Sequence, residues 1–340
     1  MGLFTKIVVV IVVIVALLAG IGMLLPRQVH VERSIVIDAP AATVYVLIDG
    51  FKQFHKWSPW AALDPNAKYS WEGPAYGVGA KQSWVGDPKK VGSGSQEIIE
   101  VKPYEMVKSH LDFGKQGVAT AQFTLSPEAT GTKVTWGLDS DMGAGPIGRY
   151  FGLMMDRMIG ADYEKGLAGL KTLAESLPKT DFADLTVTPG TVQSVNVAYA
   201  SRQSSKQTQA IGDAMGAAFT QVVAFMKAHK LTRLGAPIAI YTRWDDAGCE
   251  FDAAIPVEKG PDGPIPPDAP VQVKQTYAGR VLKVVFKGPY TGMPAINSKL
   301  TAYMAARGYE SAGPPWDEYV SDPTTTPPAE LKTNIYQPVK

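Results

Sequence analysis

Residues 313–339 read GPPWDEYVSDPTTTPPAELKTNIYQPV, and this stretch decides the fold of the C-terminal half of the chain. Residues 316–320 and 333–336 are short runs of strand-forming residues. The turn signal Ser-Asp-Pro and a loop rich in Thr and Pro separate them. The pattern predicts a β-hairpin.

Alternation along the first of these strands sorts its side chains onto two faces. Because successive strand residues point to opposite sides of a sheet, Asp317 and Tyr319 share one face, and Trp316 and Glu318 share the other. A carboxylate beside a phenol also occurs on an ordinary half-wet surface, where the acid bonds to local backbone or water. That interpretation stays open beside a binding role.

The same motif occurs earlier in the chain, at a spacing of about 78 residues. Gly-Ala-Pro at 235–237 corresponds to Gly-Pro-Pro at 313–315, and Tyr241 corresponds to Tyr319. Each copy is expected to run strand, helix, strand, strand. Two copies indicate a duplicated α+β unit rather than an extended solenoid. The halves should pack about a pseudo-twofold axis with a cleft between them, where small-molecule sites tend to form.

The repeat makes Asp317 informative, because its counterpart is Ala239 while Tyr319 is matched by Tyr241. The cleft would then hold a tyrosine from each half and an acid from only one. Desolvation destabilises a carboxylate in an aromatic pocket unless it meets a cation or a hydrogen-bond donor, and aromatic walls attract cations. The pattern favours a lipophilic cation or a donor group on the ligand.

Residues 191–340 resemble a GyrI-like effector-binding domain, the module fused to many multidrug-responsive bacterial regulators. The family pattern is an aromatic, an acid, any residue, then Tyr-x-x-Asp-Pro, closing on Thr-Glu-Ile-Tyr-x-Pro-Val. The chain has WDEYVSDP at 316–323, TNIYQPV at 333–339 and the family's Gly-Pro-Tyr at 288–290. It departs from the pattern at Asp317, where the acid is usually Glu, and at Asn334, which replaces Glu.

The resemblance and the repeat together give a candidate ligand-binding set: Asp317, Tyr319, Tyr241, Trp316, Tyr290 and Tyr336. Two alternatives to simple binding follow from the family. Some members resemble hydrolases that open strained rings of electrophilic drugs, in which case Asp317 would be the general base and Tyr319 or Tyr241 the proton donor. Other members inhibit a partner enzyme by surface contact, which an exposed apolar patch would favour. We favour binding and assign no catalytic residue.

The N-terminus carries an uninterrupted apolar run at residues 7–25, preceded by Lys6 and followed by Pro26 and Arg27. About 20 helical residues span the hydrocarbon core of a bilayer, so the run predicts an uncleaved membrane anchor over residues 1–28. A cleaved signal peptide is the alternative, although apolar residues continue past Gly22, the nearest small-residue site. A short N-terminus before a long domain favours a cytoplasmic N-terminus, with the bulk of the chain extracytoplasmic (periplasmic).

Periodicity and turn signals in residues 29–177 predict a strand at 29–38, a helix starting at Pro40, six further strands and a long helix at 147–177. The helix has an apolar stripe that is expected to lie against a curved antiparallel sheet: Tyr150, Phe151, Met154, Met158, Ile159, Leu167, Leu170 and Leu173.

Residues 29–177 resemble the START-like helix-grip fold, also called SRPBCC or polyketide-cyclase-like. The resemblance rests on four segments: IVIDAP at 35–40, WSPW at 57–60, WEGP at 71–74 and GVGA at 77–80. It implies a lipid, steroid or polyketide ligand held between the sheet and the long helix. It implies no catalytic signature.

The predicted fold class is α+β: a membrane helix, a helix-grip domain (29–177), a linker (178–190) and a duplicated β-α-β-β domain (191–340, with repeats 191–257 and 272–340). The net charge of +1 and the lack of a helix-turn-helix pattern argue against nucleic-acid binding. The sequence has no phosphate-cradling loop and no metal-ligand spacing, so no cofactor or metal is expected. The expected partners are a small hydrophobic or amphipathic ligand and the membrane, with a protein partner left open.

Overall fold

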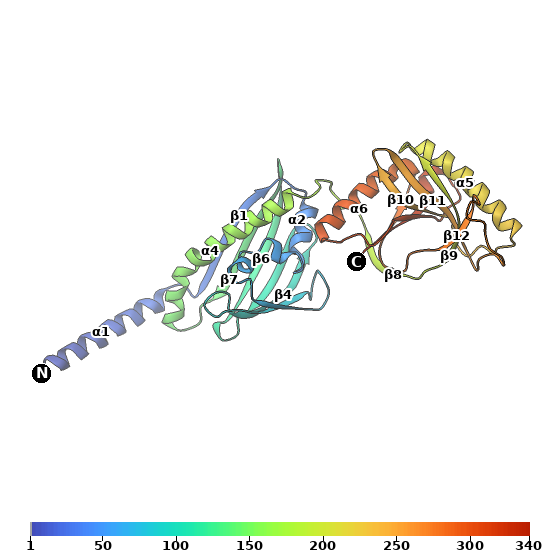
Figure 1. The fold of residues 1–340 in the computed structure, drawn as a ribbon. Coiled ribbons are helices and arrows are strands. Elements are labelled where there is room, and N and C mark those ends of the chain that lie inside the picture. Colours follow the sequence, from blue (N-terminus) through green and yellow to red (C-terminus); the bar gives the residue numbers. More distant parts are fainter. Residues whose placement is uncertain (1) are drawn as a thin grey trace. The chain divides into compact units, whose positions relative to one another are not determined.

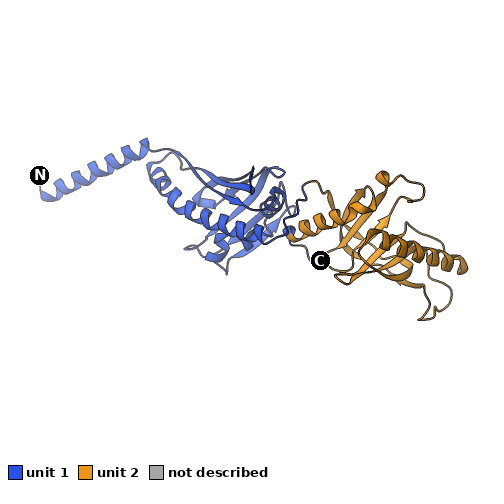
Figure 2. Cartoon of the chain, turned by 90° about the horizontal axis from the view of Figure 1, so that it is seen from above, with its two compact units in different colours: residues 1–183, 306–308 blue, residues 184–305, 309–340 orange. Residues whose placement is uncertain are grey.

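The computed structural model describes residues 2–340. They divide into two compact units, one formed by the chain up to residue 183 with 306–308, and one formed by 184–305 with 309–340 (Figures 1 and 2). The observed architecture is α+β, as the sequence predicts, and each unit is built around its own antiparallel sheet.

The chain begins with α1 (Leu3–Leu24), the apolar helix expected at the N-terminus. Its 22 residues are long and apolar enough to cross a membrane, and within residues 2–340 it is the one helix that meets this test. Among its residues only Gly22 is buried. The other side chains of α1 therefore present an apolar surface that the rest of the described chain does not cover.

The first unit is a seven-stranded antiparallel sheet in the order β1-β7-β6-β5-β4-β3-β2. Each strand lies close to where the sequence places one, and the short α3 and the 3-10 turns were not expected. In chain order the elements are β1 (Gln28–Ile37), α2 (Ala41–Ile48), α3 (Pro59–Leu63), β2 (Lys68–Glu72), β3 (Lys81–Val85), β4 (Ser93–Lys102), β5 (Met106–Asp112), β6 (Val118–Glu128), β7 (Gly131–Asp141) and α4 (Pro146–Glu175).

The second half of α4 packs on this sheet through an aromatic core. Tyr163 stacks on Trp136 of β7 at 3.8 Å between ring centroids, with the rings 8° from parallel. Gly166 makes this approach possible, because a Cβ there would lie 2.7 Å from the Trp136 ring. Trp57 and Phe123 complete the cluster, so bulky side chains fill the space under this part of the helix.

The expectation that the whole apolar stripe of α4 lies against the sheet is wrong for its first half. Leu167 and Leu170 are buried, but Phe151, Met154 and Met158 are 47%, 51% and 49% exposed. The physical reason is that apolar periodicity identifies a helix face without identifying what covers that face. Here the first half of α4 still packs on β1, through Gly152 against Val29 and Gly160 against Arg33. The three exposed residues lie on the opposite side of the helix.

The second unit is an eight-stranded sheet in the order β12-β9-β11-β10-β14-β15-β13-β8. This order is symmetric about the β10–β14 pair, as a duplicated β-α-β-β unit requires. The elements are β8 (Val187–Val192), β9 (Asn196–Ser204), α5 (Thr208–Ala228), β10 (Ile238–Asp245), β11 (Gly248–Val257), β12 (Gln272–Gln275), β13 (Gly279–Lys287), α6 (Met293–Arg307), β14 (Trp316–Tyr319) and β15 (Lys332–Pro338).

Two edge strands of this sheet were not expected. β8 pairs with β13 and begins within residues assigned from the sequence to a linker, while β12 pairs with β9. Each copy of the repeat is thereby extended by one edge strand. β8 was not predicted because it contains Pro189 and Gly190, and proline and glycine in strands are largely confined to edges and bulges.

Two leucines on α4 provide a matched test of this packing. Leu170 is fully buried and Leu153 is 61% exposed. Leu170→Ala should lower the free energy of unfolding of the first unit by about 2–5 kcal/mol, whereas Leu153→Ala should change it by no more than about 0.5 kcal/mol. Denaturant unfolding of the detergent-solubilised chain, followed by tryptophan fluorescence, measures both. Equal losses would contradict the division of α4 into a packed and an exposed face.

Candidate functional site

The two copies of the repeat meet where β10 pairs antiparallel with β14. Ala239 lies directly opposite Asp317 in this register. Since these two residues are equivalent in the repeat, the pseudo-twofold axis passes through their pairing. The flanking pairs exchange roles as the symmetry requires: Ile238 with Glu318, and Ile240 with Trp316. The same axis relates two backbone hydrogen bonds of 2.9 Å. Tyr241 N–H donates to the Pro315 carbonyl, and Tyr319 N–H donates to the Pro237 carbonyl.

Asp317 is buried on the sheet face that α5 covers. The residue is 3% exposed, and the paired Ala239 is fully buried. Residues two positions further along each strand point to the same side, which brings Tyr241 and Tyr319 to this face. Both tyrosines pack against the core formed by α5, β9 and β11, and both keep part of their surface accessible.

Aromatic rings surround the carboxyl group. Tyr319 makes edge contacts with Tyr290 at 5.5 Å and with Phe219 of α5 at 6.4 Å between ring centroids. Tyr241 lies 5.8 Å from the Trp244 ring and 6.2 Å from that of Phe251. These edge and tilted arrangements leave ring faces available for other contacts.

Burial dominates the electrostatics of the site. It raises the pKa of Asp317 to about 7, and a hydrogen bond with Tyr241 offsets part of that rise. Burial also raises the pKa of Tyr241 and of Tyr319 well above the usual phenol range. Within residues 2–340 the Oδ2 atom of Asp317 has no hydrogen-bond partner. A buried carboxyl oxygen without a partner is costly, which is typical of sites that a ligand completes.

A second buried polar atom on this face also lacks a partner. Thr333 pairs with Tyr319 in the β14–β15 register and Ile335 pairs with Asp317, so Thr333 is the diagonal neighbour of Asp317. Thr333 is fully buried, and its Oγ1 makes no hydrogen bond to any described residue. The site thus presents two unmatched oxygen atoms within an aromatic surround.

Trp316 and Tyr336 lie on the opposite face of the sheet, where they stack at 5.0 Å between centroids. Glu318 occupies the same face and accepts hydrogen bonds from Asn334 Nδ2 at 2.7 Å and from Tyr336 Oη at 3.2 Å. Of the six residues proposed from the sequence, the structure brings together Asp317, Tyr241, Tyr319 and Tyr290. It does not bring Trp316 and Tyr336 to them.

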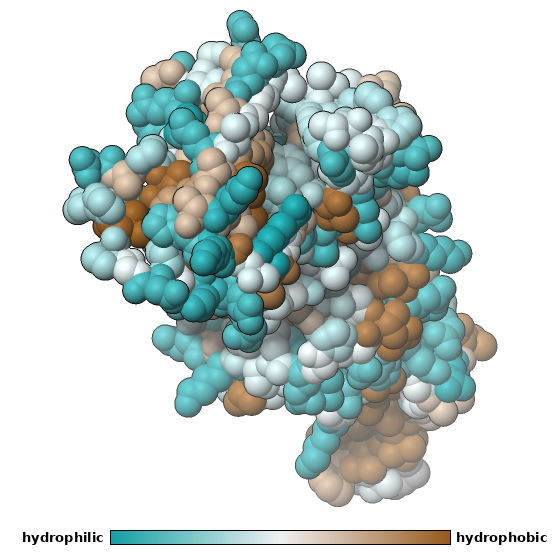
Figure 3. All heavy atoms as spheres, turned by 90° about the vertical axis from the view of Figure 1, so that its right-hand side faces the viewer, coloured by the Kyte–Doolittle hydropathy of each residue, from teal (hydrophilic) through white to brown (hydrophobic). Residues whose placement is uncertain are grey.

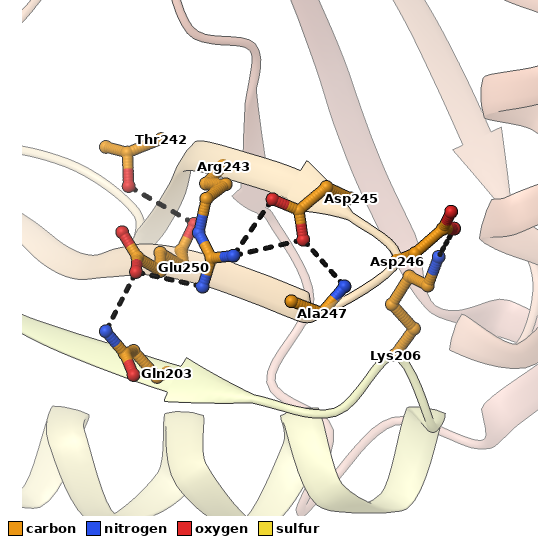
Figure 4. A network of polar contacts seen from close by, with 8 residues as sticks. All are labelled: Gln203, Lys206, Thr242, Arg243, Asp245, Asp246, Ala247 and Glu250. Carbon is orange, nitrogen blue, oxygen red and sulfur yellow. Dashed lines mark hydrogen bonds and ion pairs between the residues drawn. The ribbon is translucent and has the colours of Figure 1, made fainter.

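Beyond the site, a polar network holds the β10–β11 hairpin (Figure 4). The register shifts between Tyr241 and Arg243. The Arg243 guanidinium then contacts Asp245 at 2.9 Å and Glu250 at 3.0 Å, and Gln203 of β9 donates to Glu250 at 2.8 Å. These exposed contacts add little stability individually. They do tie three neighbouring strands together directly after Tyr241.

Sequence reasoning missed Phe219 and Thr333. The only signal for Phe219 is its position on an apolar helix stripe with Met215 and Val222, which is typical of any core helix. Thr333 belongs to the motif that defines the fold. Its place beside Asp317 depends on the β14–β15 register, which the sequence of a hairpin with a long loop does not specify.

The first unit has a separate hollow of about 570 Å³ between α3 and α4. Its lining includes His55, Trp57, Leu63, Asp162 and Lys165. Burial lowers the pKa of His55, whose Nε2 makes no hydrogen bond to any described residue. This hollow lies outside the aromatic core of Trp136 and Tyr163, which fills the space beneath α4.

Comparison with protein families assigns both halves. Residues 28–175 match the family described as polyketide cyclase / dehydrase and lipid transport. Residues 191–340 match the GyrI-like small molecule binding domain. The two resemblances seen in the sequence are thereby confirmed, and the chain contains a polyketide-cyclase-like region followed by a GyrI-like region. Both families support small-molecule binding.

Solved structures resemble single parts of the chain at low identity. The EcmrR C-terminal domain is 16% identical with a TM-score of 0.40, over 46% of this chain and 98% of that one. The di-domain ARO/CYC StfQ from the steffimycin biosynthetic pathway is 12% identical with a TM-score of 0.35, over 44% of this chain and 51% of that one. A hydrolase from Listeria innocua is 16% identical with a TM-score of 0.32, over 46% and 92%. No curated protein matches the chain at a significant level.

The raised pKa of Asp317 predicts a pH dependence of stability. The folded-state value of about 7 exceeds the unfolded value, so the folded state binds the extra proton between about pH 4 and pH 7. The contribution of this group is therefore fully present below about pH 4 and is lost as pH rises through about 7. The loss is at most about 4 kcal/mol, because each tenfold difference in proton affinity between the folded and unfolded states corresponds to about 1.4 kcal/mol.

Asp317→Asn should remove this slope, and Glu318→Gln, on the opposite face, should retain it. Denaturant midpoints of the three proteins between about pH 5 and pH 8 measure the difference. A wild-type slope that survives in Asp317→Asn would show that another group causes it.

Proposed function

We propose that the GyrI-like region binds an amphipathic small molecule at Asp317, and that a lipophilic cation is the best fit. The observation that carries this proposal is a carboxyl group that is 3% exposed, has an oxygen without a partner and stands among aromatic rings. An uncharged apolar ligand would leave that oxygen unmatched, whereas a cation or donor satisfies it.

The chemistry of such a complex follows from the pKa. Near pH 7 Asp317 is about half ionised, and a bound cation stabilises the ionised form. Cation binding should therefore release a fraction of a proton and strengthen as pH rises through about 7. The rings of Tyr241, Tyr319 and Tyr290 supply apolar area and cation–π attraction.

For the first unit we propose a hydrophobic, lipid-like ligand. The family match supports small-molecule binding there, and the aromatic cluster around Trp136 and Tyr163 occupies part of the space expected for a ligand under α4. The hollow of about 570 Å³ between α3 and α4 falls in the range typical of small-molecule pockets. We place the ligand in this hollow.

We further propose that α1 remains attached as a single-pass anchor, with the rest of the chain extracytoplasmic. Hydrogen bonds from two side chains of α4 favour retention over cleavage. Arg149 of α4 donates to the carbonyls of Met23 and Leu25, at the end of α1, where helix carbonyls otherwise lack partners. Tyr150 Oη donates to the Leu18 carbonyl at 2.7 Å. A cleaved signal peptide has no need of such contacts.

A hydrolytic activity is the second candidate, because the pKa of about 7 suits a general base at neutral pH. Asp317 would take a proton from water and Tyr241, hydrogen-bonded to it, would protonate the leaving group. Binding needs only the observed unmatched oxygen, whereas catalysis also needs an electrophilic substrate, so we place binding first.

A protein-interaction role has less support. The exposed large apolar residues of the second unit are scattered over different elements: Val223, Leu234, Trp244, Val285 and Val320. The face shown in Figure 3 is mixed in character, with small separate hydrophobic areas. Protein interfaces usually present larger contiguous patches.

Substitution of Asp317 tests the proposed site. In the detergent-solubilised chain, Asp317→Asn should weaken binding of a lipophilic cation at about pH 8 by tenfold or more, equal to about 1.4 kcal/mol, because the charge partner is lost. Quenching of tryptophan fluorescence measures the affinity, since Trp244 lies beside Tyr241.

Glu318→Gln is the matched control, being the adjacent acid on the opposite face, and it should bind like the wild type. Cation affinity that is unchanged in Asp317→Asn would exclude this site. Turnover of an electrophilic substrate that disappears in Asp317→Asn while binding persists would establish the hydrolytic alternative.

A further inference from the structure

The first half of α4 carries an apolar stripe whose residues are each about half exposed or more. Ile147, Phe151, Met154 and Met158 follow one another at spacings of four, three and four residues and are 84%, 47%, 51% and 49% exposed. At 3.6 residues per turn they form one continuous helix face. Four exposed apolar residues on one helix face are more than the scattered exposure of an ordinary surface.

This half of α4 is fixed against the last turns of α1. Gly22 is the one buried residue of α1, and a Cβ there would lie 2.6 Å from Pro146 and 2.7 Å from the Tyr150 ring. Tyr150 donates to Leu18, and Arg149 binds the carbonyls at the end of the helix. The start of α4 and the end of α1 therefore share one level along the α1 axis (Figure 1).

That level corresponds to the boundary region of a bilayer. Leu18 precedes the last residue of α1 by six residues, or about 9 Å along the helix. Amphipathic helices insert their apolar faces about 5–10 Å into the headgroup and acyl boundary, and tyrosine is enriched at this depth. If α1 spans the bilayer, its contacts place Tyr150 and the first turns of α4 at that boundary.

The charges next to the stripe fit a lipid surface. Arg157, in the same half of α4, is exposed and can meet anionic headgroups. The stripe ends at Asp162 and Lys165, which form an ion pair at 3.8 Å, with the lysine side chain 69% exposed. The apolar face is thus confined to the half of α4 nearest to α1.

We propose that residues 146–158 form a second membrane-contacting element, with the stripe embedded in the lipid leaflet that surrounds the C-terminal end of α1. The occupant of the stripe is lipid rather than a second copy of the chain, because the stripe is continuous with the membrane-spanning surface through Gly22 and Tyr150. This inference rests on the anchoring role of α1 proposed above. It adds that the first unit lies on the bilayer surface with its long helix partly immersed.

Depth-dependent quenching on the full-length chain in vesicles tests this proposal. Cys249 is the only cysteine and is fully buried, so a single introduced cysteine can be labelled selectively. Met154→Cys carries a polarity-sensitive fluorophore within the stripe. Thr172→Cys is the control, at an exposed residue on the same helix face about 27 Å further along and outside the hollow. Vesicles of phosphatidylcholine and phosphatidylglycerol contain a spin-labelled lipid whose quencher lies near the headgroups.

The label at 154 should be quenched by this lipid several-fold more strongly than the label at 172, which should instead be quenched by aqueous iodide. Equal access of both labels to iodide, in protein that floats with the vesicles, would overturn the proposal and leave the anchor intact. Shielding of position 154 that grows with protein density, without lipid quenching, would overturn it in favour of a second copy. Protein that fails to float with vesicles would overturn the anchor and, with it, this inference.

Discussion

The pairing of Ala239 with Asp317 is the constraint on which the second unit depends. It joins the two copies of the repeat edge to edge. It also places on the pseudo-twofold axis the position where one copy has an acid, Asp317, and the other has Ala239. A carboxyl group there is taken out of water, and Tyr241 provides the one hydrogen bond that offsets the raised pKa. The neighbouring acid, Glu318, has a different fate because alternation turns it to the other face, where Asn334 and Tyr336 satisfy it. Two adjacent acids on one short strand therefore have opposite roles.

Much of the fold followed from periodicity and internal repetition. The duplicated unit, the long helix and most strands were predictable because each depends on local pattern. The two faces of β14 were predictable for the same reason. The pairing register of β14 and β15 was not predictable, and this register places Thr333 beside Asp317. The same limit applies to β8, whose proline and glycine indicate a linker until pairing with β13 makes them part of a sheet edge.

The helix α4 shows why an apolar stripe is an incomplete signal. One continuous helix of 30 residues serves two environments. Its second half closes an aromatic core on Trp136, and its first half supports the end of α1 and leaves Phe151 and Met154 uncovered. In the first half the residues that face β1 are Gly152 and Gly160, so the large apolar side chains there lie on the opposite side of the helix from the sheet. A lipid surface would give the uncovered half the same apolar environment that the sheet gives the covered half.

The ionisation of Asp317 itself tests the central claim most directly. Difference infrared spectroscopy of the wild type against Asp317→Asn isolates the band of this one protonated carboxyl, which can be titrated from about pH 4 to about pH 9. The account predicts a midpoint near pH 7 that moves to lower pH when a saturating lipophilic cation is added, because the cation stabilises the ionised form. A midpoint near pH 4 that does not respond to the cation would contradict it, since the carboxyl would then be hydrated or already paired.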